Sequence, residues 1–219
     1  MKNAFLISLI ILFSNTLSAQ QYLTDDASCI DRYLALSEAA FDKGEMEEYA
    51  AYMYDSVKVC LVGRTIKNTV LKTVDGQLIH TDSIQENILL IFSASWCKPC
   101  VANIPAINML AQQANQLKII LMYWDDQAKV EEISSKYADG VVLVPSLVTN
   151  EVEMDMTYGN IFHQLGYPTS YAINPQNEIV DLFTGAVVPG EYGNGISISE
   201  KEALQKNYDR LVELLSQIK

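Results

Sequence analysis

A run of apolar residues that leads into a closely spaced pair of cysteines constrains this chain most. Residues 87–92, Asn-Ile-Leu-Leu-Ile-Phe, have the unbroken hydrophobicity of a central strand that is buried on both faces. Cys97 and Cys100 follow, and residues 97–116 carry apolar side chains at helical spacing. The sequence therefore predicts a buried strand that feeds a helix, with both cysteines at the start of that helix.

This position suits thiol chemistry. The reactive species is the thiolate, and the partial positive charge of a helix N-terminus stabilises Cys97 in that form. Lys98 adds a cation, while Pro99 removes a backbone donor and stiffens the first turn. Cys100 is spaced to attack a mixed disulfide on Cys97, and Trp96 can cover one side of the pair. The segment 96–100 therefore predicts a redox-active dithiol.

Two other interpretations of the cysteine pair are weaker. A structural zinc site needs four ligands, usually from a second Cys or His pair. The only histidines are His80 and His163, and the other cysteines lie in a distant segment, so we expect no metal. A purely stabilising disulfide closes so short a loop that it contributes little loop-closure entropy.

The rest of the chain after residue 64 alternates between strand and helix patterns. Residues 69–80 predict a β-hairpin with a type I′ turn at Asp75-Gly76. Ser199 and Glu202 form a capping box for a last helix. Further strands are expected at 118–124, 141–147, 171–174 and 178–183, a helix at 126–137, and a helical turn within 159–165. Together these elements predict an α/β fold, a mixed central β-sheet flanked by helices.

Residues 22–62 predict two helices joined by a turn at Lys43-Gly44. Helices joined by so short a turn lie antiparallel, which brings Cys29 towards Cys60. A structural disulfide, two buried free thiols and a second redox pair all remain open, because sequence does not fix cysteine connectivity.

The first residues have the pattern of an export signal. Lys2 precedes an apolar run over residues 4–13, and small residues ending at Ala19 offer a cleavage site. The run is about half the length of about 20 residues that a membrane span needs. We therefore expect a cleaved signal peptide over 1–19 and a periplasmic or otherwise exported protein, in which disulfides persist.

Composition excludes some partners. The chain has 27 acidic and 15 basic residues, a net charge of −12, and no basic run. Such a surface repels nucleic acid and anionic membranes, since binding to either requires Lys and Arg to neutralise phosphates. Nearly half of the residues are apolar and 19% are charged, as in a globular protein with a sizeable core.

The segment from Phe92 to Cys100 resembles the active-site strand and turn of the thioredoxin superfamily, above all the exported ResA- and TlpA-like branch. The resemblance covers about residues 64–219 and includes Pro105 and the loop 166–169. It implies a thioredoxin-like domain over 64–219, preceded by a helical hairpin extension over 20–63. It also implies a cis peptide before Pro168 and a substrate strand that pairs with the backbone of Tyr167.

The same resemblance implies the chemistry and its partners. The redox centre would be the Cys97–Cys100 disulfide, with no other cofactor. Exported protein disulfides or dithiols would be the substrates, and a membrane-embedded thiol protein would be a suitable electron donor.

Two positions depart from the pattern of the superfamily. Ile91 and Asn103 stand where related proteins carry acidic residues that help to move the proton of the resolving thiol. Water, Asp125 or Asp126 would then serve instead. His163 could tune a thiolate, and Trp124, Asp125 and Asp126 end a central strand where they could line the cleft. We favour a surface or hydrogen-bonded position for His163 and a packing role for Trp124.

Three functions compete. The leading one is disulfide exchange with protein substrates, in the direction of reduction. A thiol peroxidase of the same fold would carry Thr or Ser three residues before its reactive Cys, where this chain has Ala94. A non-enzymatic module would use residues 22–62 to recruit a partner.

Overall fold

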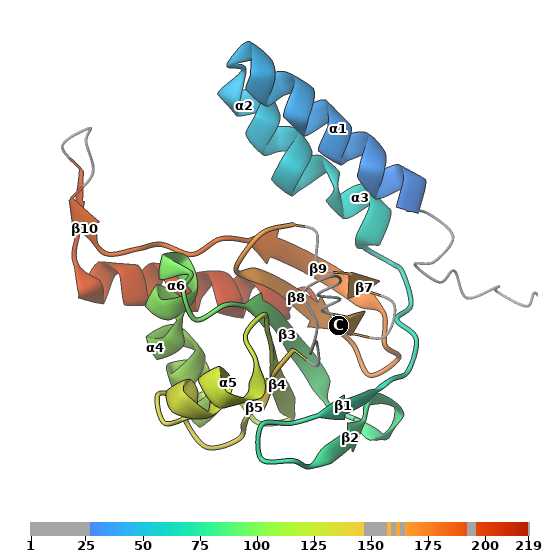
Figure 1. The fold of residues 1–219 in the computed structure, drawn as a ribbon, viewed down its shortest axis with the longest axis vertical. Helices are drawn as coiled ribbons and strands as arrows, with labels where there is room; N and C mark the ends of the chain where they lie inside the picture. The colour runs from blue at the N-terminus through green and yellow to red at the C-terminus, as the bar shows by residue number, and fades with distance from the viewer. Residues whose placement is uncertain (1–26, 147–156, 159–160, 163–164, 192–195, 219) are drawn as a thin grey trace, which may run out of the picture.

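The core of the protein is a five-stranded mixed sheet. The computed structural model describes residues 27–146, 157–158, 161–162, 165–191 and 196–218. The sheet has the order β5-β4-β3-β8-β9, in which β3, β4 and β5 are parallel and β8 runs antiparallel to both β3 and β9 (Figure 1). Its strands are β3 Asn87–Ser93, β4 Leu117–Tyr123, β5 Val141–Val144, β8 Thr169–Ile173 and β9 Ile179–Thr184.

The central strand β3 supplies both sides of the core. Ile88, Leu90 and Phe92 belong to the hydrophobic cluster on one face of the sheet. Leu89 and Ile91 belong to the cluster on the other face. Side chains alternate along a strand, so a strand that is covered on both faces must be apolar throughout. This burial accounts for the unbroken apolar run in the sequence.

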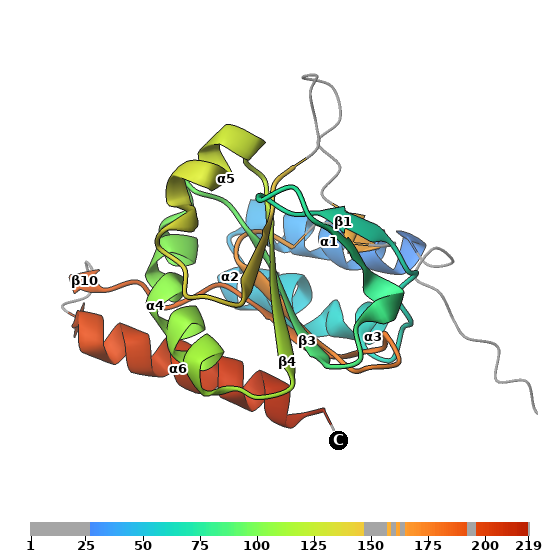
Figure 2. The ribbon, with the colours of Figure 1, turned by 90° about the horizontal axis from the view of Figure 1, so that it is seen from below.

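Three helices cover one face of the sheet, namely α4 Lys98–Gln113, α5 Gln127–Ser134 and α6 Glu200–Ser216 (Figure 2). Ser199 caps α6, since its Oγ accepts a hydrogen bond of 3.2 Å from the backbone N–H of Glu202. The buried Asn207 joins α6 to α4 by donating to the carbonyl of Ala102. These elements confirm the predicted α/β class with a mixed sheet and flanking helices.

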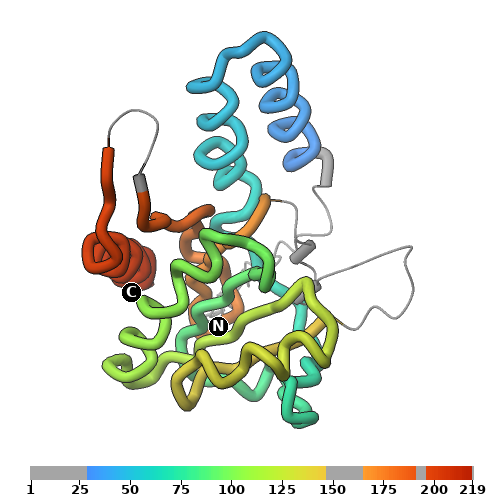
Figure 3. The backbone as a smooth tube through the Cα atoms, turned by 60° about the vertical axis from the view of Figure 1, so that its left-hand side comes forward, coloured from blue at the N-terminus to red at the C-terminus, as the bar shows by residue number. Residues whose placement is uncertain are grey.

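The N-terminal helices form an arm over the other face, comprising α1 Ala27–Lys43, α2 Met46–Ala50, the π-helix η2 Ala51–Ser56 and α3 Lys58–Leu61. Gly44 makes the turn with a φ of 77°, a left-handed conformation that glycine adopts without strain. The arm stands out from the domain, with the α1–α2 turn at its far tip (Figure 3). The predicted helical hairpin is thus confirmed, while its boundary at residue 63 stays a prediction.

The base of this helical arm (residues 27–61) is fixed to the sheet. A Cys29–Cys60 disulfide joins α1 to α3 with Cα atoms 5.8 Å apart, which realises one of the three alternatives left open for these cysteines. Val57, Cys60 and Leu61 are buried in the core cluster of that face. Lys58 Nζ also lies 3.0 Å from a carboxylate oxygen of Asp181 on β9.

The predicted β-hairpin is confirmed as β1 Val70–Lys72 and β2 Leu78–His80, but its predicted turn type is wrong. A type I′ turn needs positive φ at both central residues, and of Asp75 and Gly76 only Gly76 has it. The N–H of Gly76 instead bonds to the carbonyl of Thr73, and the N–H of Thr73 to that of Gln77. This pattern is a three-residue loop with glycine in the left-handed position.

The helical turn predicted within 159–165 is also wrong at residues 161–162, while 159–160 and 163–164 lie outside the described residues. Ile161–Phe162 forms β7, which pairs with β6 Thr157–Tyr158. All four residue types favour strands, which outweighs the local helical pattern. The sequence patterns also missed the 3₁₀ turn Thr81–Ser83 and the short pair β10 Gly190–Glu191 and β11 Ser197–Ile198.

The expected signal peptide over 1–19 and His163 lie outside the described residues. Within the described ranges, none of the helices has the length and hydropathy of a membrane span.

Candidate active site

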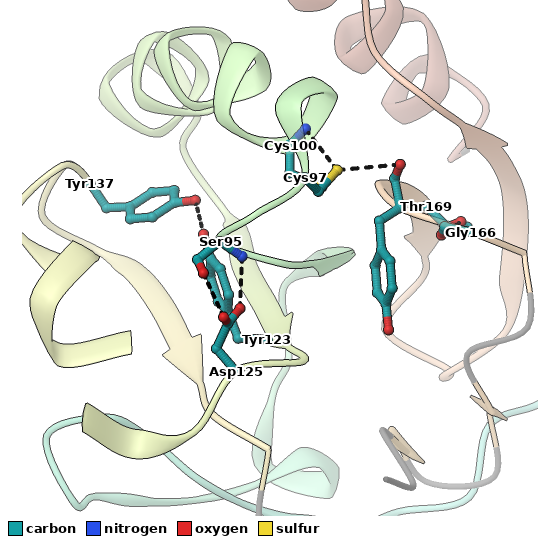
Figure 4. The surroundings of a disulfide bond; sticks show 9 residues. Ser95, Cys97, Cys100, Tyr123, Asp125, Tyr137, Gly166 and Thr169 are labelled. Carbon is teal, nitrogen blue, oxygen red and sulfur yellow. Dashed lines mark hydrogen bonds between the residues drawn. A yellow bond between two sulfur atoms is a disulfide. The ribbon is translucent and has the colours of Figure 1, made fainter. Parts of the chain in front are cut away.

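Cys97 and Cys100 lie where β3 passes into α4. Cys97 is the N-cap residue of α4, and its Sγ accepts a hydrogen bond of 3.2 Å from the backbone N–H of Cys100. The two residues form a disulfide with Cα atoms 5.2 Å apart (Figure 4). Pro99 occupies the first turn, where a missing N–H costs nothing, and Lys98 is exposed. The helix N-terminus therefore directs its partial positive charge at the sulfur of Cys97.

The loop before β8 faces this sulfur. The Tyr167–Pro168 peptide is cis, as the resemblance implied. The carbonyl oxygen of Tyr167 lies 3.5 Å from Cys97 Sγ. Thr169 stabilises the loop by donating a hydrogen bond of 2.8 Å from its Oγ1 to the carbonyl of Gly166. The fold thus brings together the cysteine pair and the proline loop.

Three aromatic residues surround the pair. Trp96 is 64% exposed, and its ring meets that of Tyr167 edge-to-face at 5.7 Å. The ring of Trp124, the residue after β4, also lies 6.1 Å from that of Tyr167. Burial, and then the negative charge of Asp125, raise the pKa of the Tyr167 phenol above its usual value, so the phenol stays neutral. These rings give the pair an apolar rim.

A carboxylate fixes the turn that carries the cysteines. Asp125 accepts hydrogen bonds from the backbone N–H of Ser95 at 2.7 Å and from its Oγ at 2.5 Å (Figure 4). The sequence predicts that Asp125 lines the cleft or serves as an acid, and Ser95 has no predicted role. The signal for their contact is position, since both residues follow neighbouring parallel strands whose ends meet at one edge of the sheet.

The positions that lack an acid are filled by buried, non-titrating side chains. Ile91 is in the core, and Asn103 is 2% exposed on α4, three residues after Cys100. Among the described residues, Nδ2 of Asn103 finds no hydrogen-bond partner. Of the two alternative acids, Asp126 caps α5 by accepting from the N–H of Lys129 at 2.9 Å. Asp125 is instead held at the cysteine turn by the hydrogen bonds that Ser95 donates to it.

A tyrosine pair, buried at Tyr123 and partly buried at Tyr137, lies beside this turn. The hydroxyls of Tyr123 on β4 and Tyr137 after α5 are hydrogen-bonded to each other (Figure 4). Burial raises the pKa of both phenols above the usual value. Within the described part of the chain, no group of three or more His, Cys, Asp or Glu side chains is arranged to hold a metal ion.

Comparison with known proteins identifies the family. The model of the AhpC/TSA family matches residues 62–182, more than half of the chain. The chain belongs to the AhpC/TSA family. The match begins where the helical arm ends and runs into β9, so the AhpC/TSA segment includes the cysteine pair and the proline loop.

Individual relatives of this AhpC/TSA protein are distant. It is 26% identical over 131 residues to the thioredoxin-like protein YneN of Bacillus subtilis, which covers 59% of this chain and 75% of YneN. It is 26% identical over 148 residues to the thiol-disulfide oxidoreductase ResA of Oceanobacillus iheyensis, covering 62% and 71%. A thio-disulfide isomerase from Thermus thermophilus is a structural neighbour with a TM-score of 0.48, 18% identity, and coverage of 70% of this chain and 96% of that one.

Proposed function

We propose that this protein is an exported thiol–disulfide oxidoreductase that exchanges disulfides with protein substrates and acts as a reductase. The observation that carries the proposal is the position of Cys97. Its sulfur caps a helix, accepts the N–H of Cys100, and faces the carbonyl of Tyr167. A thiolate stabilised by a helix N-terminus is nucleophilic near neutral pH. The names of the two relatives agree with this chemistry.

The reaction has two exchange steps. In the reduced protein, the Cys97 thiolate attacks one sulfur of a substrate disulfide, which forms a mixed disulfide and releases the first substrate thiolate. Cys100, as thiolate, then attacks Cys97 Sγ, forms the Cys97–Cys100 bond and releases the second substrate thiolate. Two electrons pass from the dithiol to the substrate, and each released thiolate takes a proton from solvent. The disulfide in this structure is the product state.

The loop opposite Cys97 serves as the substrate platform. The backbone of Tyr167 can pair with an extended segment that flanks the substrate cysteine, because its carbonyl lies next to the reacting sulfur. Trp96 offers an exposed ring on the same rim. Lys98 adds positive charge near the thiolate, and Pro99 keeps the first turn of α4 rigid.

The side chains of Ile91 and Asn103 cannot accept the proton of Cys100, so another group must do so. Asp125 is held by Ser95 at the cysteine turn and supplies a fixed negative charge there. Water that reaches the pair is the other proton acceptor. We therefore expect the second exchange step to be slower than in relatives with a buried acid.

The proposed location follows from the N-terminal segment and the second disulfide. Residues 1–19 have the pattern of a cleaved signal, and the Cys29–Cys60 bond suits an oxidising compartment. The reductase direction requires a thiol donor that reduces Cys97–Cys100 after each turnover. A membrane-embedded thiol protein would supply these electrons from the cytosolic side.

Peroxide reduction is the less favoured alternative. Ala94, three residues before Cys97, is buried and has no hydroxyl to bind a peroxide oxygen. The Cys97 sulfur is instead bonded to Cys100 within the same turn.

Trapping tests the proposal. Cys100→Ala removes the resolving thiol, so Cys97 should accumulate mixed disulfides with exported proteins, visible as reductant-sensitive bands. The double variant Cys97→Ser/Cys100→Ala is the matched control and should trap nothing. If neither variant shows mixed-disulfide bands, and the wild type consumes peroxide much faster than a free thiol does, disulfide exchange is rejected in favour of a peroxidase.

A further inference from the structure

A cleft of about 520 Å³ lies between the helical arm and the sheet, next to the proposed active site. Tyr167 and Gly166 of the proline loop form part of one wall, together with Phe183 and Gly185 at the end of β9. The arm supplies the opposite wall through Tyr54 and neighbouring residues. Because Tyr167 belongs both to this cleft and to the rim around Cys97, the cleft continues the proposed substrate platform.

The arm wall has an unusual backbone. Residues Ala51–Ser56 form a π-helix between α2 and α3, and the cleft is lined at this point by Tyr54 and Asp55. π-Helical turns are rare and frequently mark functional sites, because the extra residue per turn displaces side chains from their α-helical positions. The π-helix therefore lies where the arm faces the proline loop.

Aromatic rings continue from the cleft towards the tip of the arm. The ring of Tyr54 lies 6.3 Å from that of Tyr49, which lies 5.6 Å from that of Phe41. Phe41 is 57% exposed and Tyr54 is 37% exposed. We call Phe41, Tyr49 and Tyr54 the aromatic row. Large apolar side chains that stay exposed in a line commonly mark a binding surface.

The basic residues in the cleft are already engaged. Lys58 pairs with Asp181 at 3.0 Å. Arg210 donates to the carbonyls of Thr184 and Gly185 and stacks over the ring of Phe183 at 4.2 Å. Their charges thus stabilise the walls, which leaves the aromatic rings as the surface offered to a partner.

We propose that the cleft and the aromatic row bind an extended segment of the client polypeptide, next to the client cysteine that is joined to Cys97. The segment would present aromatic or large aliphatic side chains to Tyr54, Tyr49 and Phe41. This inference rests on the proposed function and adds a substrate class to it: unfolded or extended protein chains with apolar side chains some residues away from the reactive cysteine.

A client polypeptide is the expected occupant of the cleft, because the cleft adjoins the sulfur of Cys97 through Tyr167. A client joined to Cys97 would have its chain beside Tyr167, and because Tyr167 also lines the cleft, one direction of that chain would lead into the cleft. Beyond the cleft, the aromatic row offers further ring contacts to an extended chain. The arm keeps its place during exchange because Val57, Cys60 and Leu61 are buried in the core cluster and Lys58 contacts Asp181.

A pair of peptides tests the proposal. Each peptide carries one cysteine as a mixed disulfide with thionitrobenzoate, and they differ only in having either Phe and Tyr or Ser at several positions away from the cysteine. The second-order rate constant of reduction by the reduced protein is measured for both. We expect the aromatic peptide to react about tenfold faster. In Phe41→Ala/Tyr54→Ala this ratio should fall to about one.

Two controls complete the experiment. Val59→Ala alters an arm residue that is 71% exposed but outside the aromatic row, and should keep the wild-type ratio. Tyr54→Phe keeps the aromatic ring and should also keep the wild-type ratio of rate constants. An unchanged rate ratio in Phe41→Ala/Tyr54→Ala overturns the proposal. A stable dimer in sedimentation velocity that this double variant dissociates also overturns it, since a second copy of the chain would then cover the aromatic row. If the wild type reduces neither peptide, the proposed function itself fails.

Discussion

The Sγ atom of Cys97 lies 3.5 Å from the carbonyl oxygen of Tyr167, although 70 positions separate the two residues in the sequence. The antiparallel pairing of β8 with β3 produces this proximity, because it returns the chain to the end of β3 at which Cys97 emerges. The proposed nucleophile therefore has the backbone of Tyr167 beside it, where a substrate chain could pair. It also predicts that residues of the rim affect protein substrates through binding.

Trp96→Ala and Tyr167→Ala should each lower kcat/KM for a protein disulfide by about three- to tenfold. An edge-to-face aromatic pair contributes about 0.5–1.5 kcal/mol beyond its buried area, and either change removes the Trp96–Tyr167 pair. Insulin reduction followed by turbidity measures the effect. Leu78→Ala, an exposed apolar residue on β2, is the matched control and should leave the rate unchanged. A loss as large in this control would show that the rim has no specific role.

Asp125→Asn should destabilise the protein by about 1–3 kcal/mol. The carboxylate accepts two hydrogen bonds from Ser95, and hydrogen bonds to a charged group contribute about 1.5–3 kcal/mol each. The amide that replaces the carboxylate would still accept one of them, which reduces the loss. Urea unfolding gives the free energy directly. Asp139→Asn, an exposed carboxylate, should change it by less than about 0.5 kcal/mol. Equal stabilities for the two variants would contradict a structural role for the Ser95–Asp125 contact.

Loss of the arm disulfide should cost stability while the redox centre is kept. In Cys29→Ser/Cys60→Ser, a loop with a sequence separation of 31 is no longer closed in the unfolded chain, which corresponds to about 2–4 kcal/mol. Denaturant unfolding without reductant compares this variant with the wild type. A difference below about 0.5 kcal/mol would mean that the bond does not restrain the unfolded state.

Alkaline pH should destabilise the fold through its buried tyrosines. The folded protein holds the pKa of Tyr123 and Tyr137 above the usual value of about 10, so the stability that depends on their protons is complete below pH 10. As the pH rises above 10, the unfolded chain ionises first and the free energy of unfolding falls by up to about 1.4 kcal/mol per pH unit and tyrosine.

Tyr137→Phe tests this pH dependence, since it removes one of the titrating groups. Urea unfolding between pH 8 and 11 should show a shallower decline in the variant than in the wild type. Tyr208→Phe, whose hydroxyl bonds to Gln113 on the exposed surface, is the control and should keep the wild-type slope. Identical slopes in Tyr137→Phe and the wild type would contradict the account.

Local patterns predicted most of the fold. The apolar run of β3, the capping box at Ser199 and the spacing in α1 are short-range signals, and all three elements form where expected. The turn at Asp75-Gly76 failed because two turn types share the same dipeptide, and the hydrogen bonds of Thr73 decide between them.

The candidate site was only partly predictable for a different reason. Cys97 and Cys100 are separated by only two residues, so their spacing alone indicates their chemistry. The contact of Ser95 with Asp125 and the cleft beside Tyr167 depend on segments that only the folded sheet brings together. The π-helix that carries Tyr54 has no sequence signature comparable to a cap or a turn.

Exchange of a small disulfide by the Cys97→Ser variant shows directly whether Cys97 is the nucleophile. The attacking thiolate is assigned to Cys97 alone, so reduction of a model aromatic disulfide by the dithiothreitol-reduced, desalted variant should fall to the uncatalysed rate. Circular dichroism should show that the variant is folded, since a single buried sulfur changes to oxygen at the N-terminus of α4. A rate equal to that of the wild type would contradict the assignment of Cys97 as the nucleophile.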